Sequence, residues 1–92
     1  MIELTIIIPV YNEIKKIEKL IKKILKIDIK KQIIIIDDGS SDGTELVLAK
    51  YKKKIDKLII HKKNLGKGAA IQSGQRFVKG KYVGIQDADL EY

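Results

Sequence analysis

Two runs of β-branched residues constrain the fold of this chain more than any other feature. Residues Leu4–Val10 and Gln32–Ile36 are almost continuously apolar, and both are far shorter than the roughly 20 residues of a membrane-spanning helix. Such runs are typical of parallel strands that are buried on both faces of a sheet. Weaker strand patterns follow at Leu58–His61 and Tyr82–Gln86. The sequence therefore predicts four strands of one parallel sheet.

Helical patterns separate these strands along the chain. They fall at about Glu13–Ile27, Gly43–Lys53 and Gly68–Val78, so strands and helices alternate. Alternation with short connections implies right-handed crossovers and a parallel sheet of the nucleotide-binding type. We expect an α/β fold, a three-layer α/β/α Rossmann-like sandwich with the strand order 3-2-1-4.

The expected helix boundaries coincide with residues that favour caps. Asn12 suits the N-cap of the first helix, and Ser41 or Asp42 suits the start of the second. Gly80 is a C-cap candidate for the third helix.

The composition excludes several classes of site and partner. The 92 residues include no cysteine, which excludes disulfides and thiolate zinc sites and fits a reducing cytoplasm. The net charge of +7 suits a basic module for nucleic acid or an anionic membrane, which is the alternative function. However, the lysines of residues 15–26 alternate with isoleucine and leucine, as on the wet face of an amphipathic helix, and few aromatic residues are present to stack bases. We expect a cytoplasmic protein without a nucleic-acid partner, with peripheral contact at the cytoplasmic membrane face as a further option.

Every predicted strand ends in a polar or glycine-rich cluster. The four clusters are Pro9–Glu13, Asp37–Gly43, His61–Gly68 and Asp87–Asp89. Each cluster taken alone is ordinary, because Asp-Gly pairs are common in turns and His61 suits a partly exposed strand end. In open parallel sheets, however, ligands bind beyond the carboxyl ends of the strands. The joint occurrence of the four clusters therefore predicts a ligand site at that edge.

The spacing of Asp87 and Asp89 suits a hard divalent cation. Two carboxylates one residue apart can hold Mg²⁺ or Mn²⁺ together with diphosphate oxygens, and Glu91 can join or steer this shell. Lys67 lies between glycines before a predicted helix N-terminus, where it can meet a phosphate or a phospholipid. The G-x-G-x-x-G and P-loop patterns are both absent from the loops that would carry them. A nucleotidyltransferase shares such a sheet but would carry a glycine-rich, basic loop directly after the first strand.

The same motifs closely resemble the family 2 glycosyltransferases of the GT-A fold. The matching segments are Ile8–Glu13, Asp37–Thr44, Asn64–Ala70 and Asp87–Leu90. The nearest similarity is to polyprenyl-phosphate sugar transferases of the dolichol-phosphate mannose synthase type. The resemblance implies metal-dependent, inverting transfer of a sugar from a UDP-, GDP- or similar nucleotide sugar. The acceptor would be a polyprenyl (dolichyl) phosphate or a saccharide.

The resemblance also assigns roles to individual residues. It places Pro9, Tyr11 and Glu13 along the nucleoside, with Tyr11 against the base. It gives Asp38 a hydrogen bond to the base, and it makes Asp87 and Asp89 a D-x-D pair that contacts ribose, diphosphate and metal. The expected nucleotide-binding residues are Pro9, Tyr11, Glu13, Asp37, Asp38, Lys67 and Asp87, and the expected metal ligands are Asp87, Asp89 and Glu91.

The resembled family carries its acceptor-binding half and catalytic residues later in the chain than Tyr92. We therefore expect residues 1–92 to be a single partial domain, the nucleotide-sugar-binding part, with the acceptor-binding half absent and the catalytic residues beyond Tyr92. Such a part is expected to bind donor without turnover. It is also expected to form homo-oligomers through an unpaired sheet edge.

Overall fold

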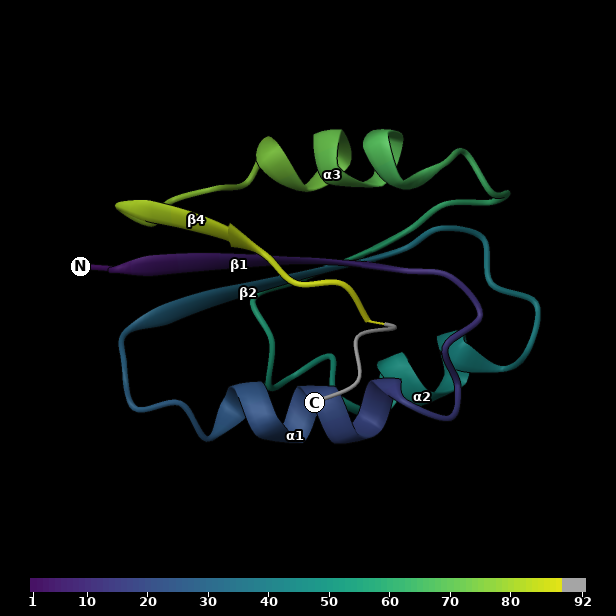
Figure 1. Cartoon of the computed structure of the whole chain (residues 1–92), viewed down its shortest axis with the longest axis horizontal. Helices are drawn as coiled ribbons and strands as arrows, with labels where there is room; N and C mark the ends of the chain where they lie inside the picture. The colour runs from purple at the N-terminus through teal and green to yellow at the C-terminus, as the bar shows by residue number, and fades with distance from the viewer. Residues whose placement is uncertain (89–92) are drawn as a thin grey trace.

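The computed structural model describes residues 1–88, which form a four-stranded sheet with helices on both faces (Figure 1). The elements are β1 (Leu4–Val10), α1 (Ile17–Leu25), β2 (Lys31–Asp37), α2 (Thr44–Lys50), β3 (Lys57–Ile60), α3 (Lys67–Gln75) and β4 (Tyr82–Ile85). All strand pairs are parallel, and the order across the sheet is β3-β2-β1-β4. The predicted α/β fold, the alternation and the strand order are confirmed.

The two isoleucine-rich strands form the middle of the sheet. β1 pairs with β2 along its whole length, from Leu4 beside Lys31 to Val10 beside Asp37. β4 lies along the other side of β1, and β3 lies along the other side of β2. Every residue after the first one in β1 and in β2 is buried. This burial agrees with strands that are covered on both faces.

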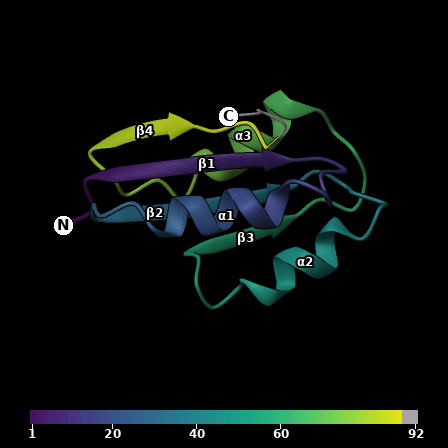
Figure 2. The same ribbon diagram turned by 60° about the horizontal axis from the view of Figure 1, so that its bottom comes forward.

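The sheet separates two apolar layers (Figures 1 and 2). α1 and α2 lie against one face of the sheet, and α3 lies against the other. Side chains alternate along the strands, so Ile8 belongs to the core under α1 and α2, whereas Ile7 packs with Ala70 of α3. Gly74 allows α3 to approach closely, since a Cβ there would lie 2.8 Å from Cδ1 of Ile36.

The first helix is shorter than its sequence pattern predicted. α1 begins at Ile17, with Lys16 at the N-cap position. Asn12 has a φ of 51°, and its side chain accepts a hydrogen bond from the backbone N of Ser41 at 2.8 Å. The expected cap was wrong because a contact with a distant loop uses the same oxygen. None of the helices in residues 1–88 has the length and apolarity that crossing a bilayer requires.

The second helix begins after a left-handed glycine. Gly43 occupies the N-cap position with a φ of 95°. Oδ1 of Asp42 accepts a hydrogen bond from the backbone N of Thr44 at 3.0 Å, so the carboxylate satisfies an amide of the first turn. Of the two capping residues expected here, Asp42 is therefore the one that supplies the side-chain oxygen.

The third helix ends before the predicted glycine. Its C-cap is Arg76, whereas Gly80 packs against β1. The backbone N of Gly80 donates to Oγ1 of Thr5 at 2.8 Å, and a Cβ on this glycine would lie 2.6 Å from the backbone N of Thr5. The expected cap was wrong because the glycine instead permits a close approach between the turn before β4 and the sheet.

Candidate functional site

A cleft of about 450 Å³ opens at the carboxyl ends of β1 and β4, beside the start of α3. Its walls are formed by Pro9, Val10, Tyr11, Glu13, Asp38, Asn64, Gly66, Lys67, Ala70, Asp87 and Ala88. All of the predicted nucleotide-binding residues except Asp37 are among them. The clusters that follow the four strands therefore meet at one edge of the sheet, where ligands of open parallel sheets bind.

Hydrogen bonds join the loops that follow β1 and β2. The backbone N of Asn12 donates to Oγ of Ser40 at 2.9 Å, and the backbone N of Glu13 donates to Oγ1 of Thr44 at 3.1 Å. These bonds fix the backbone along one wall of the cleft. Tyr11 remains 47% exposed on this wall, so its ring has surface with which to stack on a ligand.

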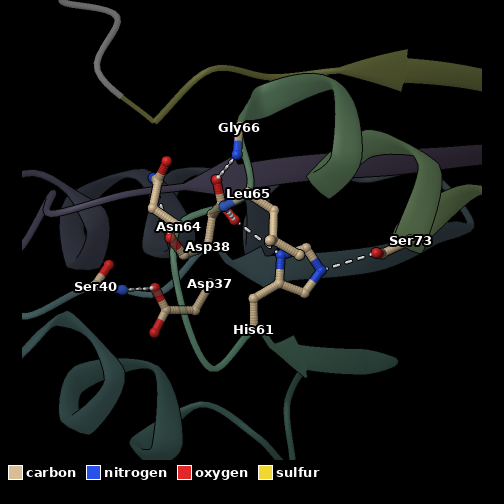
Figure 3. Close-up of polar contacts among 8 residues, drawn as sticks. All are labelled: Asp37, Asp38, Ser40, His61, Asn64, Leu65, Gly66 and Ser73. Atoms are coloured by element: carbon tan, nitrogen blue, oxygen red, sulfur yellow. Dashed lines mark hydrogen bonds and ion pairs between the residues drawn. The ribbon is translucent and has the colours of Figure 1, made fainter.

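Asp38 joins the end of β2 to the loop before α3 (Figure 3). Its Oδ1 accepts a hydrogen bond from the backbone N of Leu65, and its Oδ2 accepts one from the backbone N of Gly66, both at 2.9 Å. Its backbone carbonyl accepts a hydrogen bond from Nδ2 of Asn64 at 3.3 Å. Asp38 is only 3% exposed, so this carboxylate presents little surface to the cleft.

His61 holds the same carboxylate from the end of β3 (Figure 3). Its Nδ1 lies 2.9 Å from Oδ1 of Asp38, and its Nε2 lies 2.9 Å from Oγ of Ser73 on α3. An ionised carboxylate only accepts hydrogen bonds, so Nδ1 is the donor toward Asp38. The sequence indicated an ordinary strand-end histidine, whereas the structure places it in a hydrogen-bonded chain that links β2, β3 and α3. Its side chain is 11% exposed.

The pKa of Asp38 lies below its usual value of 3.8 although the residue is buried. Burial raises the pKa, but the hydrogen bonds from His61 and from the backbone N atoms of Leu65 and Gly66 outweigh this effect. The carboxylate is therefore ionised at neutral pH and places a fixed negative charge in the wall of the cleft.

Asp37 lies apart from the cleft although it is adjacent to Asp38 in sequence. Figure 3 shows the two carboxylates pointing away from each other. Asp37 is 1% exposed, and its Oδ1 accepts a hydrogen bond from the backbone N of Ser40 at 3.2 Å. Its Oδ2 has no hydrogen-bond partner among the described residues. In residues 1–88, Asp37 thus stabilises the turn after β2 by this hydrogen bond and does not line the cleft.

Comparison with known protein families identifies the family of this chain. Residues 5–92 match the model described as glycosyl transferase family 2. The chain belongs to this family. The expected resemblance to polyprenyl-phosphate sugar transferases of the GT-A fold is confirmed by two curated lipid-phosphate transferases and by a solved mannosyltransferase structure.

Two curated relatives act on lipid phosphates according to their names. A dolichyl-phosphate beta-glucosyltransferase of Trichomonas vaginalis is 34% identical over 97 residues, which cover 94% of this family 2 chain and 30% of the relative. An undecaprenyl-phosphate 4-deoxy-4-formamido-L-arabinose transferase of Salmonella choleraesuis is 33% identical over 96 residues, which cover 97% of this chain and 29% of the relative. The chain therefore spans about 30% of the length of each of these two relatives.

A solved glycosyltransferase structure shares the fold. The mannosyltransferase PcManGT from Pyrobaculum calidifontis, in complex with GDP-Man and Mn²⁺, superposes with a TM-score of 0.86 and 29% identity. The match covers 95% of this chain and 27% of the mannosyltransferase. The sheet and helices described above are thus those of a GT-A nucleotide-binding region.

Two of the predicted site residues of this family 2 chain form an ion pair. Nζ of Lys67, the first residue of α3, contacts Oδ1 of Asp87 after β4. The Asp87 side chain is 32% exposed and is paired with the Lys67 ammonium. Carboxylate oxygens are also the ligands that Mg²⁺ and Mn²⁺ prefer, so the chemistry of Asp87 fits such a metal. Residues 1–88 contain no group of three or more His, Cys, Asp or Glu side chains placed to hold a metal. The other two predicted ligands, Asp89 and Glu91, lie outside the described residues.

Several lining residues were not predicted as site residues. Asn64 and Gly66 lie in the cluster after β3 that the sequence indicated, and the φ of 100° at Gly66 explains why a glycine stands there. Val10, Ala70 and Ala88 also line the cleft, but no polar group distinguishes them in the sequence. Their small or apolar side chains leave room for a ligand, which only the folded structure reveals.

Proposed function

We propose that this chain is the donor-binding part of a metal-dependent, inverting glycosyltransferase that transfers a sugar from a nucleotide sugar to a polyprenyl phosphate. The observation that carries the proposal is the cleft in which Tyr11, Asp38, Lys67 and Asp87 meet at the carboxyl edge of the sheet. The names of the relatives support the lipid-phosphate acceptor, with a saccharide as the other acceptor class. The mannosyltransferase complex supports a nucleotide-sugar donor and a divalent metal.

Each wall of the cleft suits a different part of the donor. Pro9, Tyr11 and Glu13 would line the nucleoside, with the Tyr11 ring against the base and Asp38 accepting a hydrogen bond from it. Lys67 at the N-terminus of α3 would contact the diphosphate, because a helix N-terminus and an ammonium both favour anions.

Asp87, together with Asp89 and Glu91, would hold Mg²⁺ or Mn²⁺ beside the diphosphate. Such a cation neutralises the charge that develops on the departing nucleoside diphosphate. The reaction breaks the bond from the anomeric carbon to the diphosphate oxygen and forms a bond to the acceptor oxygen on the opposite face, which inverts that carbon. A phosphate acceptor is already anionic, whereas a saccharide hydroxyl must also lose its proton to a base. Because this chain spans about 30% of the length of the two lipid-phosphate transferases, we propose that it binds donor and that turnover needs further residues.

Titration calorimetry with UDP- and GDP-sugars, with and without Mn²⁺, tests the proposal. We expect binding that requires Mn²⁺ and that Asp87→Asn weakens. A basic module for nucleic acid or anionic membranes would instead bind polyanions with a steep salt dependence and would be indifferent to Asp38 and Asp87. That result would replace the proposal, and transfer of radiolabelled sugar to a polyprenyl phosphate by residues 1–92 would contradict the expected lack of turnover.

A further inference from the structure

The net positive charge of this chain belongs to one continuous segment. Residues 57–86 contain no aspartate or glutamate and hold seven of the 19 basic residues. The remaining residues therefore include 12 basic and 12 acidic ones, so their formal charges cancel. The basic residues of the segment are Lys57, Lys62, Lys63, Lys67, Arg76, Lys79 and Lys81. A surface formed by this segment attracts anions, whereas the rest of the chain is neutral as a whole.

The lysines of the α1 and α2 layer lie among acidic side chains instead. Oε2 of Glu18 on α1 lies 3.8 Å from Nζ of Lys50 on α2, so these two charges oppose each other. Asp28, after α1, and Glu45, on α2, are both exposed. The lysine pattern of α1 is therefore the wet face of an amphipathic helix and does not form an uninterrupted basic surface.

The acid-free segment, residues 57–86, forms the other face of the molecule. It runs from β3 through α3 to β4, and α3 lies on the side of the sheet away from α1 and α2 (Figure 1). Lys57 of β3 is directed to this side, because its Nζ lies 4.4 Å from the ring centroid of Phe77, which follows α3. Arg76 and Lys79 are exposed beside Phe77 in the chain. Three positive charges therefore gather around the C-terminal end of α3.

The neighbouring acidic residues do not compensate these three charges. Asp56 precedes Lys57, but its Oδ2 accepts a hydrogen bond from the backbone N of Ile33 on β2 at 2.7 Å. Asp87 pairs with Lys67 at the other end of α3. Within residues 1–88, the ion pairs involve none of the three charges around the C-terminal end of α3. These charges are free to meet an anionic partner.

Exposed apolar side chains flank α3 within this basic surface. Leu65 precedes the helix and Phe77 follows it, and both are exposed. Apolar side chains among lysines suit the boundary between lipid headgroups and acyl chains. A nucleic acid fits less well, because the Lys57 ammonium covers one face of the Phe77 ring and Arg76 is the only arginine of the chain.

We propose that the basic surface of residues 57–86 docks this chain on the anionic surface of a lipid bilayer. The choice of a membrane rests on the proposed function, in which the acceptor is a lipid phosphate. Lys67, the first residue of α3, also lines the cleft, so the basic surface continues to the cleft. A bilayer bound along α3 brings the phosphate of a lipid acceptor to the same side of the molecule as the cleft.

Sedimentation of the 92-residue chain with lipid vesicles tests the docking. We expect the chain to bind vesicles of equimolar phosphatidylglycerol and phosphatidylcholine, and to bind vesicles of phosphatidylcholine alone at least about ten-fold more weakly. Failure to bind the anionic vesicles would overturn the inference.

Two triple variants with the same net charge locate the binding surface. The face variant removes three charges around the end of α3 by Lys57→Gln, Arg76→Gln and Lys79→Gln. The control variant removes three exposed charges in or next to α1 by Lys19→Gln, Lys22→Gln and Lys26→Gln. Each basic residue near an anionic leaflet strengthens binding by about five-fold, so the face variant should bind anionic vesicles at least about ten-fold more weakly, and the control variant should stay within about three-fold of the original. Equal losses would show that only overall charge matters and would overturn the docking surface.

Nucleotide binding separates this inference from the proposed function. None of the substituted residues lines the cleft, so calorimetry should give the same UDP affinity in Mn²⁺ for both variants and for the original chain, which also shows that the variants fold. Vesicle binding by a chain that binds no nucleotide would refute the proposed function and leave the docking surface in place. A face variant that loses affinity for a poly(dT) oligonucleotide but keeps its affinity for anionic vesicles would assign the surface to nucleic acid and overturn the inference.

Discussion

Lys67 and Asp87 form an ion pair that joins the first residue of α3 to the loop after β4, at the wall of the cleft. Both side chains are partly exposed, at 56% and 32%. The pair places a cation where the proposed metal would bind and a carboxylate where the proposed diphosphate would bind. Donor and metal must therefore replace this contact with contacts of their own.

Removing the Lys67 ammonium should affect metal and nucleotide in opposite directions. Lys67→Met frees Asp87, so we expect Mn²⁺ alone to bind several-fold more tightly, while UDP in Mn²⁺ binds about 1–3 kcal/mol more weakly because a charge-assisted contact is lost. Titration calorimetry measures both affinities. Lys63→Met is the matched control, because it removes the same charge from an exposed lysine of the adjacent loop. Equal Mn²⁺ affinities in the two variants would refute the competition.

The Asp38 network should make stability depend on pH in the acid range. The folded-state pKa of Asp38 is lowered, so the ionised carboxylate stabilises the fold above the unfolded pKa of about 3.9, and this contribution is lost as the pH falls through the folded pKa. Asp38→Asn should lower the free energy of unfolding by about 1–3 kcal/mol at pH 7. In urea titrations, the difference between the two proteins should shrink below about pH 4. Asp28→Asn, which removes an exposed aspartate, should show no such convergence.

Gly39 should tolerate no side chain. Its φ is 76°, and a Cβ would lie 2.5 Å from the backbone N of Asn64, so alanine must displace the loop that binds Asp38. We expect Gly39→Ala to cost about 2 kcal/mol or more of unfolding free energy and to weaken nucleotide binding. Gly68→Ala is the control, because nothing lies within 4 Å of its Cβ position in α3 and alanine favours helices. A Gly39→Ala protein as stable as Gly68→Ala would show that the loop can move freely.

Thr5 should contribute to stability without contributing to the cleft. Its hydroxyl donates to Oε1 of Gln32 and accepts from the backbone N of Gly80, each at 2.8 Å, near the amino end of β1. Thr5→Val keeps the shape but leaves the backbone N of Gly80 without its acceptor and removes one of the two hydrogen bonds to Oε1 of Gln32, which also accepts from the backbone N of Lys79. This loss should cost about 1–3 kcal/mol in urea unfolding. Nucleotide affinity measured at a temperature where the variant is folded should be unchanged. A large loss of affinity would mean that the two ends of the sheet are coupled.

The β4 edge should promote self-association of the chain. Among the described strands, β4 has a neighbour only on its β1 side, and its side chains at Val83 and Ile85 are about half exposed. We expect light scattering at high protein concentration to detect dimers or larger species. Val83→Lys should shift the chain toward the monomer, whereas Leu46→Lys on α2 should not, although Leu46 is even more exposed. A monomer mass for the unmodified chain would refute the edge contact.

The order of elements and the position of the site follow from local sequence patterns. A β-branched run such as Leu4–Val10 has no polar face, so it can only be buried on both sides, and the intervening patterns then place helices on both faces. Polar clusters directly after such strands must lie at the carboxyl edge of a parallel sheet. The cleft was therefore predictable from periodicity and motif order, which are local properties of the chain.

Tertiary structure alone decided which of the clustered side chains face the cleft. Asp37 and Asp38 are neighbours with the same chemistry, but they point apart at the end of β2, and only Asp38 lines the cleft. His61 lies 23 residues away from Asp38, and a hydrogen bond over that separation leaves no local signal in the sequence. The same reason explains why Asn12 does not cap α1, since Ser41, 29 residues away, donates to its side chain. Local patterns determine where polar groups gather, whereas their hydrogen-bond partners depend on contacts that exist only after the strands have paired.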